Sequence, residues 1–192
     1  MAKTEIRVGV LALQGAFEEH IDMLHSVQLV DADGQAVAVC AFAVRLPEQL
    51  ADADALVLPG GESTTIGKRP IWGTCAGMIM LAQSAKHAEQ VSRNFFGAQV
   101  RSFEQLVEGP PGFNAEPYNA VFIRAPAIIS VGESIEELSR IHAAKPADGS
   151  DPTDVIIAAR KKNILVTAFH PELTNDNRWH HYFLQTIALP LL

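Results

Sequence analysis

Cysteine is scarce in this chain: only Cys40 and Cys75 occur among its 192 residues. Two cysteines cannot build a disulfide framework, although they could form one pair, and this favours a reducing compartment. Long apolar runs are also missing, since no stretch approaches the roughly 20 apolar residues of a membrane-spanning helix. The short apolar run behind the charged N-terminus is broken by Gly9 and Gly15, which indicates a first strand and not a signal peptide. We therefore expect a cytoplasmic protein with no membrane partner.

Positive charge is in deficit as well. The chain has 15 Lys and Arg residues against 22 Asp and Glu residues, a formal net charge of −7. A nucleic-acid-binding surface needs clustered basic residues, so nucleic acid is not an expected partner. The sequence has no C-x-x-C or H-x-x-x-H pair, which argues against a zinc site. We expect neither a metal nor a cofactor.

What the sequence does contain is the pattern of an α/β protein, with 48% apolar residues. Val8–Leu13 and Ala55–Leu58 are almost wholly apolar, as strands buried on both faces of a parallel sheet are. Between them, Phe17, Ile21 and Leu24 recur at helical spacing with charged residues in the gaps. No internal repeat and no dividing linker is present. The sequence predicts one domain over residues 1–192, with a mostly parallel sheet flanked by helices in three layers.

The remaining elements follow from shorter patterns. Lys161 to Asn163 separate two apolar runs and predict a hairpin, and Asn175 or Asp176 can cap the last helix. The expected order is a strand over Ala36–Val44, a helical turn at Pro47–Leu50, strands over Ala98–Phe103 and Ala120–Arg124, a short helix or turn over Ser134–Ile141, hairpin strands Val155–Arg160 and Ile164–Phe169, and a final helix through Trp179, Phe183 and Ile187.

The connection between two of the expected strands is unusually short. Neighbouring parallel strands need a crossover of about a dozen residues or more, usually with a helix. The chain has barely that number between Leu58 and Ile71, and most of them are loop-like. The segment from Gln83 to Ser92 is similarly abrupt. Either a crossover helix has been lost, or residues of the natural chain are absent at both places.

The stretch from Ile71 to Leu81 carries the clearest chemical signal. It predicts a strand, a sharp turn and a helix, with Cys75 at the turn between Gly73 and Gly77. This G-x-C-x-G pattern is the thiol counterpart of the G-x-S-x-G nucleophile elbow. A cysteine at a helix N-terminus lies in a positive field that favours the reactive thiolate. Cys75 is therefore a candidate nucleophile, and the alternative is a buried structural cysteine beside packing glycines.

His170-Pro171-Glu172 follows the last expected buried strand and supplies the other half of a thiol mechanism. Proline biases the residue before it towards extended geometry, in which residues i and i+2 face the same side. Glu172 could then orient the imidazole of His170 and fix its tautomer. A nucleophile, a base and a group that orients the base form the triad of thiol catalysis. His180 and His181 could face solvent on the final helix, and we assign them no role.

Six motifs in this order resemble one family. The chain is similar to the glutaminase subunits of pyridoxal 5'-phosphate synthase, which are class I (triad) glutamine amidotransferases. The resemblance runs from Val8 to the final helix and implies the flavodoxin-like α/β fold of that class. It departs from the family at the two short segments and in an enlarged region around Val30 to Val44. The motifs are Leu11-Ala-Leu-Gln-Gly-Ala-Phe17, Leu58-Pro-Gly-Gly-Glu-Ser-Thr-Thr65, Gly73-Thr-Cys-Ala-Gly-Met78, Arg93-Asn-Phe-Phe-Gly97, Val121-Phe-Ile-Arg-Ala-Pro126 and Phe169-His-Pro-Glu-Leu-Thr174.

The resemblance implies a role for each site residue. Cys75 would attack the side-chain amide carbon of L-glutamine, His170 would pass a proton to the departing ammonia, and Glu172 would orient His170. The backbone N–H groups of Gly61 and Ala76 would form the oxyanion hole. The amino-acid end of the substrate needs a cation for its carboxylate and an acceptor for its ammonium. The implied glutamine-binding residues are Arg93 and Arg124 for the carboxylate, Glu62 for the ammonium, and Gln14, Gly61, Ser63 and Ile123.

The resemblance also implies a partner. The ammonia would pass to a (β/α)8-barrel synthase subunit that builds pyridoxal 5'-phosphate, and the glutaminase would be nearly silent until docked. One alternative is the glutaminase of another pathway, such as imidazole glycerol phosphate synthesis. Another is a non-catalytic or redox-sensing cysteine protein on a related fold. His170 and Glu172 argue against the latter, because such a protein needs no His-Pro-Glu partner.

Overall fold

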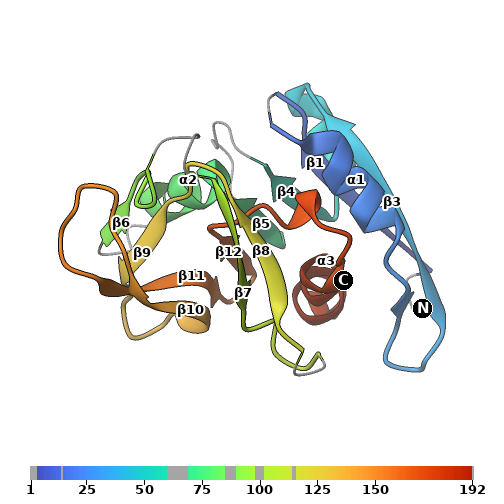
Figure 1. The fold of residues 1–192 in the computed structure, drawn as a ribbon. Helices are drawn as coiled ribbons and strands as arrows, with labels where there is room; N and C mark the ends of the chain where they lie inside the picture. Colours follow the sequence, from blue (N-terminus) through green and yellow to red (C-terminus); the bar gives the residue numbers. More distant parts are fainter. Residues whose placement is uncertain are drawn as a thin grey trace.

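The computed structural model describes residues 4–13, 15–59, 69–84, 90–97, 102–113 and 116–191. Five parallel strands form its centre (Figure 1). Their spatial order is β3 (Ala36–Val44), β1 (Glu5–Leu11), β4 (Ala55–Leu58), β5 (Ile71–Thr74) and β12 (Ile164–Thr167). Each pairs in parallel with the next. The α/β class and the buried central strands are confirmed.

Antiparallel strands extend this parallel centre on both sides. β2 (Leu29–Val30) pairs with β3 at one edge. Beyond β12 the sheet continues through β11 (Thr153–Lys161), β9 (Ala127–Ser130) and β6 (Gln90–Ser92), and β10 (Glu136–Ala144) pairs with β11. A separate hairpin consists of β7 (Phe103–Val107) and β8 (Tyr118–Phe122).

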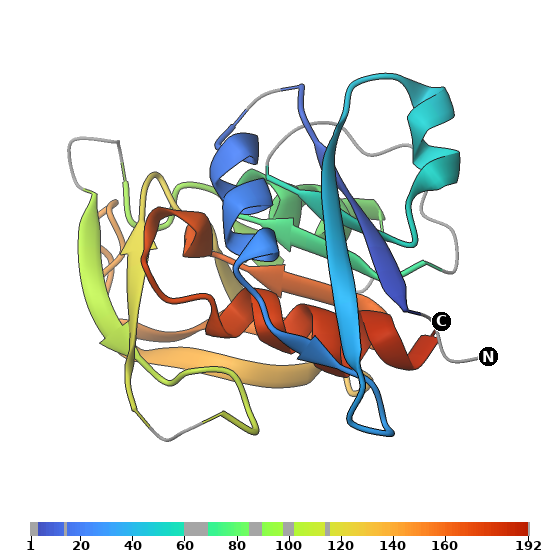
Figure 2. The same ribbon diagram turned by 90° about the vertical axis from the view of Figure 1, so that its right-hand side faces the viewer.

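Helices cover both faces of the sheet, as predicted. Figure 2 shows α1 (Phe17–His25) and α3 (Arg178–Tyr182) in front of the sheet and α2 (Ala76–Ser84) behind it. The two cores reflect the alternation along β4: Ala55 and Val57 lie in the core that contains α1 and α3. Leu56 and Leu58 pack with Leu81 of α2 on the other face. The 3₁₀ helix η1 (Pro47–Asp52) borders that second core, and α3 continues through η4 (Phe183–Ala188) and η5 (Leu189–Leu191).

One predicted element is wrong in type. The segment expected as a short helix or turn, Ser134–Ile141, contains most of β10. Leu138 and Ile141 are buried three residues apart, which imitates helical spacing. The cause is the irregular pairing of β10 with β11, whose register shifts interrupt the usual period of two.

Several other strands and helices begin or end at residues different from those expected. The strand expected over Ala98–Phe103 begins at Phe103 as β7, and residues 98–101 lie outside the described part of the chain. The strand expected over Ala120–Arg124 ends at Phe122, because Arg124 adopts a φ of 46°. The hairpin of β11 and β12 is confirmed, with Lys162 at a φ of 54° in its turn. The final helix is also confirmed, but its N-cap is Asn177 and not Asn175 or Asp176 as expected; the carboxylate of Asp176 accepts the Arg178 N–H at 3.0 Å.

The two connections that the sequence analysis found unusually short lie mostly outside the described residues. β4 and β5 are parallel neighbours joined by residues 59–70, of which 60–68 lie outside the described ranges. The same holds for residues 85–89, between α2 and β6. Among the described residues, no helix has the length and apolar character to cross a membrane.

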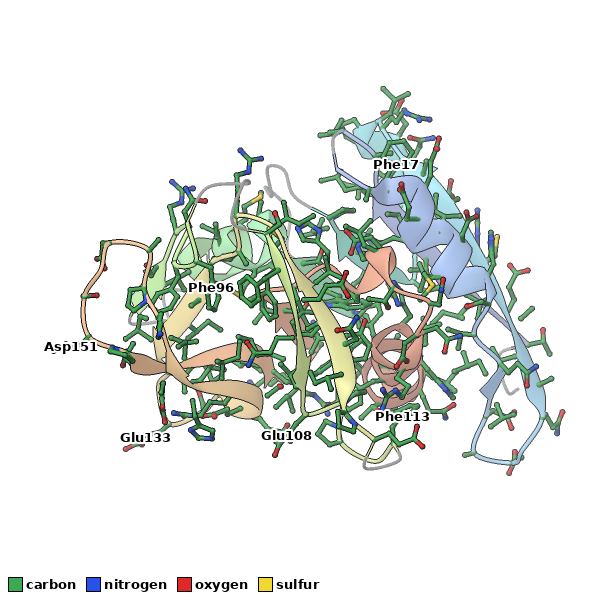
Figure 3. The ribbon with its side chains drawn as sticks, in the orientation of Figure 1. Phe17, Phe96, Glu108, Phe113, Glu133 and Asp151 are labelled. Atoms are coloured by element: carbon green, nitrogen blue, oxygen red, sulfur yellow. The ribbon has the colours of Figure 1, made fainter. Side chains whose placement is uncertain are left out.

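Aromatic packing fixes the β7–β8 hairpin against the rest of the molecule. Phe96, which is labelled in Figure 3, lies 5.1 Å from Phe103 and 5.4 Å from Phe122, measured between ring centroids. Phe122 also packs against Phe169 at 5.9 Å. Residues 123–124 follow Phe122 and residue 170 follows Phe169, so this packing holds together two segments that line the candidate site.

Candidate active site

Cys75 lies on a strained turn between β5 and α2. Its φ of 47° is a left-handed conformation that few side chains adopt without a compensating role. A Cβ on Gly77 would run into the carbonyl oxygen of Leu58, and one on Gly73 would lie 2.6 Å from the oxygen of Gly77. Neither position has room for a larger residue, so the structure shows the tight elbow that the G-x-C-x-G pattern predicts.

Backbone hydrogen bonds hold this elbow at the carboxyl end of the sheet. The Cys75 N–H donates to the oxygen of Thr167 at 2.8 Å, and the Met78 N–H donates to the Cys75 oxygen at 3.1 Å. The half-buried thiol donates to the carbonyl of Ile123 at 3.8 Å. Ala76 is the first residue of α2, where a backbone N–H has no partner within the helix. The sulfur therefore lies beside a helix N-terminus, next to a backbone N–H that the helix itself leaves unpaired.

His170 and Glu172 meet, although not in the extended geometry that was expected. Nδ1 of His170 lies 2.8 Å from Oε1 of Glu172, whose side chain is fully buried. The intervening chain is a single 3₁₀ turn over Pro171–Leu173, and His170 has φ −104° and ψ 87°. The prediction of an extended segment is wrong, because proline also suits the first position of a turn. The His170 N–H donates to Val121 at 2.9 Å, which ties the turn to β8.

Electrostatics keeps the acid ionised and the base protonated. Burial alone would lower the pKa of His170, but hydrogen bonds to Cys75 and Glu172 and their charges raise it to about 10. Burial would likewise raise the pKa of Glu172, but His20 and His170 hold that pKa well below its usual range. The site thus places His170 between a sulfur and a carboxylate, which is the arrangement of a nucleophile, a base and the group that orients the base.

Two further histidines lie beneath this group, and the sequence reasoning did not find them. His20 of α1 and His180 of α3 are both completely buried. His20 Nδ1 lies 3.0 Å from His180 Nε2, and His20 Nε2 lies 3.2 Å from Glu172 Oε2. Burial and the nearby His20 hold the pKa of His180 well below its usual range. The expectation that His180 could face solvent is wrong.

A signal for both histidines exists in the sequence. His20 stands three residues after Phe17 and four before Leu24, which places it on the apolar face of α1. His180 stands three residues before Phe183, on the apolar face of the last helix. A polar residue at a core-facing position of a helix indicates a buried partner.

A pocket of about 350 Å³ opens over Cys75 at the ends of the parallel strands. Ligands of open α/β sheets bind at this edge. Arg124 and Asn94 border the pocket with φ values of 46° and 52°, so three strained non-glycine residues surround it, Cys75 included. The lining residues are Gly15, Pro59, Cys75, Ala76, Ile79, Asn94, Ile123, Arg124 and His170.

The sequence-predicted substrate residues divide into three groups. Arg124 and Ile123 line the pocket. Arg93 is exposed, and its neighbour Asn94 borders the pocket instead. The third group lies outside the described residues and consists of Gln14, Gly61, Glu62 and Ser63.

Comparison with known proteins gives one consistent result. The model of the SNO glutamine amidotransferase family matches residues 10–189. A Herpetosiphon aurantiacus protein named pyridoxal 5'-phosphate synthase subunit PdxT is 44% identical over 207 aligned positions, which cover 92% of this chain and 98% of that protein. An Arabidopsis thaliana protein named probable pyridoxal 5'-phosphate synthase subunit PDX2 is 38% identical, covering 93% of this chain and 84% of its own length. Both alignments are longer than this chain, so these relatives carry internal residues that have no counterpart here.

Solved structures agree with the sequence relatives. A crystal structure of a glutamine amidotransferase is 36% identical and superposes with a TM-score of 0.68, covering 92% of this chain and 96% of its own. The structure of PurLQS from Thermotoga maritima is only 13% identical and shares the fold with a TM-score of 0.56, covering 96% of this chain and 94% of its own.

Proposed function

Because this chain belongs to the SNO glutamine amidotransferase family, we propose that it is the glutaminase subunit of a pyridoxal 5'-phosphate synthase. It hydrolyses L-glutamine to L-glutamate and ammonia, and the ammonia serves vitamin B6 biosynthesis. The observation that carries this proposal is the strained Cys75 elbow, which opens into a pocket together with the His170–Glu172 pair. The family description supports the use of glutamine, and the names of relatives 44% and 38% identical to this chain support the pathway.

The chemistry proceeds in two halves. The Cys75 sulfur attacks the side-chain amide carbon of glutamine, and His170 gives its proton to the departing ammonia. The tetrahedral intermediate carries an oxyanion, which accepts hydrogen bonds from the backbone N–H groups of Ala76 and Gly61. Each such donor typically lowers the activation free energy by about 3 kcal/mol. Water then attacks the γ-glutamyl thioester, His170 takes one of its protons, and glutamate leaves with the thiol restored. Glu172 orients His170 throughout.

The residues that bind the α-carboxylate and the ammonium of glutamine select the substrate. Arg124 borders the pocket, and its guanidinium suits the α-carboxylate. Arg93, Glu62, Gln14, Ser63 and Ile123 complete the proposed binding set, with Glu62 as the acceptor for the ammonium. The chain supplies this site from a single domain and uses no cofactor or metal.

The partner is a (β/α)8-barrel synthase subunit in the cytoplasm, and neither nucleic acid nor a membrane takes part. The glutaminase is nearly silent until it docks on the barrel. If the chain instead served another amidotransferase complex, such as imidazole glycerol phosphate synthase, the same triad would respond to a different partner.

Glutamate release from glutamine tests this function. We would measure it with the purified chain alone, with a pyridoxal phosphate synthase barrel subunit, and with Cys75→Ala as control. Activity that appears with the barrel and disappears in Cys75→Ala is expected. A folded chain that stays inactive with this barrel, and becomes active with the synthase of another pathway, would overturn the assignment to pyridoxal 5'-phosphate.

A further inference from the structure

His20 connects two parts of the site that are far apart in the sequence. Its ring is completely buried, and its Nε2 lies 3.2 Å from Oε2 of Glu172 and 3.3 Å from Oγ1 of Thr74. Thr74 is the last residue of β5 and directly precedes Cys75. One imidazole thus contacts both the residue before the nucleophile and the acid that orients the base.

The second oxygen of Glu172 needs this contact. Oε1 is bonded to His170, whereas Oε2 is buried and has no well-aligned hydrogen-bond donor in the described part of the chain. Nε2 of His20 approaches this oxygen to 3.2 Å without forming an aligned hydrogen bond, and the same nitrogen is hydrogen-bonded to Oγ1 of Thr74 at 3.3 Å. A buried carboxylate oxygen with no donor would be costly, and it would leave the carboxylate free to rotate away from His170.

The contacts of His20 and His180 indicate which of their ring nitrogens carry protons. An ionised carboxylate only accepts hydrogen bonds, so Nε2 of His20 must carry a proton. Nδ1 of His20 then faces Nε2 of His180 at 3.0 Å, and one of these two nitrogens must donate. The other ring nitrogen of His180, Nδ1, is buried without a partner among the described residues. An orphaned acceptor is less costly than an orphaned N–H, which favours a His180 that donates its Nε2 proton to His20.

Packing holds both rings in place. Trp72 of β5 lies 4.9 Å from His180 and 5.8 Å from His20, measured between ring centroids, and both contacts are edge-on. The indole N–H of Trp72 donates to Thr167 Oγ1 at 3.2 Å. The two histidines therefore cannot turn without disturbing the centre of the sheet.

We propose that His20, held by His180, is a positioning residue for the glutaminase reaction: its Nε2–H fixes the second oxygen of Glu172 so that the first stays on His170. This inference rests on the proposed function. His20 does not touch the pocket, so it acts on the rate of the chemical step and not on glutamine binding.

Two amide substitutions separate this role from simple packing. In His20→Gln the amide nitrogen can take the place of Nε2 and keep a donor towards Glu172. In His20→Asn the amide reaches only the place of Nδ1, towards His180. Both are neutral and polar, and they differ in which ring nitrogen they replace. His25→Asn, at an exposed position of the same helix whose Nε2 accepts the Ala41 N–H at 3.2 Å, controls for the loss of a histidine that ties α1 to the sheet away from the site.

Each variant would be assayed for glutamate release in the complex with the barrel subunit, with unfolding midpoints measured in parallel. We expect His20→Asn to lower kcat about 10- to 100-fold with KM within about threefold. His20→Gln should stay within about threefold of the wild type, and His25→Asn should equal it. Equal losses in the two amide variants, a wild-type kcat in His20→Asn, or losses that follow the unfolding midpoints would each overturn the inference.

A spectroscopic measurement tests the contact without using activity. The ¹⁵N shifts of the imidazole nitrogens report which of them carries a proton, and they can be read on the wild-type chain even if His20→Asn does not fold. A protonated Nε2 on His20 is the expected result, and an unprotonated Nε2 would overturn the inference. A wild-type complex with no glutaminase activity would instead contradict the proposed function.

Discussion

Oε1 of Glu172 lies 2.8 Å from Nδ1 of His170, and the two residues are joined by a single 3₁₀ turn that starts at Pro171. The carboxylate can therefore hold the ring of His170 in one orientation, with Nε2 directed away from it. Because Glu172 is buried, the pair keeps this orientation without competition from water.

The first prediction concerns Glu172→Gln. The amide keeps the shape of the side chain but presents a donor or a neutral acceptor to His170, so the ring loses the charged group that orients it. We expect kcat for glutamate release to fall about 100-fold or more, with a smaller change in KM. Glu133→Gln, at an exposed carboxylate shown in Figure 3, should have wild-type kinetics. A Glu172→Gln enzyme with wild-type kcat would exclude an orienting role.

A second prediction concerns the titration of His170. Burial lowers the pKa of His170, but hydrogen bonds to Cys75 and Glu172 raise it to about 10, and the hydrogen bond to Cys75 is the largest of the raising causes. Removing the sulfur in Cys75→Ala leaves burial opposed mainly by Glu172, so the pKa must fall. We expect the NMR titration midpoint of the His170 ring protons to drop by about one unit or more. A midpoint that stays the same or rises would show that Cys75 does not interact with His170.

The glycines of the elbow give a third prediction, about stability. A methyl group on Gly77 would overlap the carbonyl oxygen of Leu58, which is part of β4 and cannot move without the sheet. We expect Gly77→Ala to lower the free energy of unfolding in urea by about 3 kcal/mol. In Gly109→Ala the nearest atom is Nη1 of Arg178 at 3.1 Å, a side-chain atom that must shift by a few tenths of an ångström while it stays hydrogen-bonded to Glu116, so the loss should be smaller, about 1 kcal/mol. Similar values for both variants would contradict the tight elbow.

Much of this arrangement could be predicted from the sequence, because its signals are local. Buried parallel strands are continuous apolar runs, and β4 falls where such a run predicts it, whereas β5 was predicted from the elbow pattern that follows it. The elbow could be recognised because Gly73 and Gly77 are needed on steric grounds at fixed distances from Cys75. The approach of Glu172 to His170 was foreseen from their spacing, although the turn that achieves it was not.

The elements that the sequence reasoning missed depend on contacts across the chain. β10 is a strand because it pairs with β11, and its register shifts hide the alternation. β2, β6 and β9 have two to four residues each, too few for a periodic pattern. His20 and His180 are 160 residues apart, and only the packing of α1 beside α3 brings their rings together.

A fourth prediction separates the two candidate arginines. Both side chains are exposed, but Arg124 borders the pocket and Arg93 is not among its lining residues. We expect Arg124→Gln to raise KM for glutamine about tenfold or more with a smaller change in kcat, since the guanidinium binds the part of the substrate that does not react. Arg93→Gln should raise KM less. A larger effect in Arg93→Gln would assign the α-carboxylate to Arg93.

The most direct test of the account is the site of covalent capture by a glutamine analogue that carries an electrophile at its side-chain end. The complex with the barrel subunit would be treated with the analogue, with and without excess glutamine, and digested with trypsin for mass mapping. The account predicts one adduct on Cys75, none on Cys40, and loss of the adduct when glutamine is present. An unmodified Cys75 in a preparation that releases glutamate, or an adduct that glutamine does not suppress, would contradict Cys75 as the nucleophile.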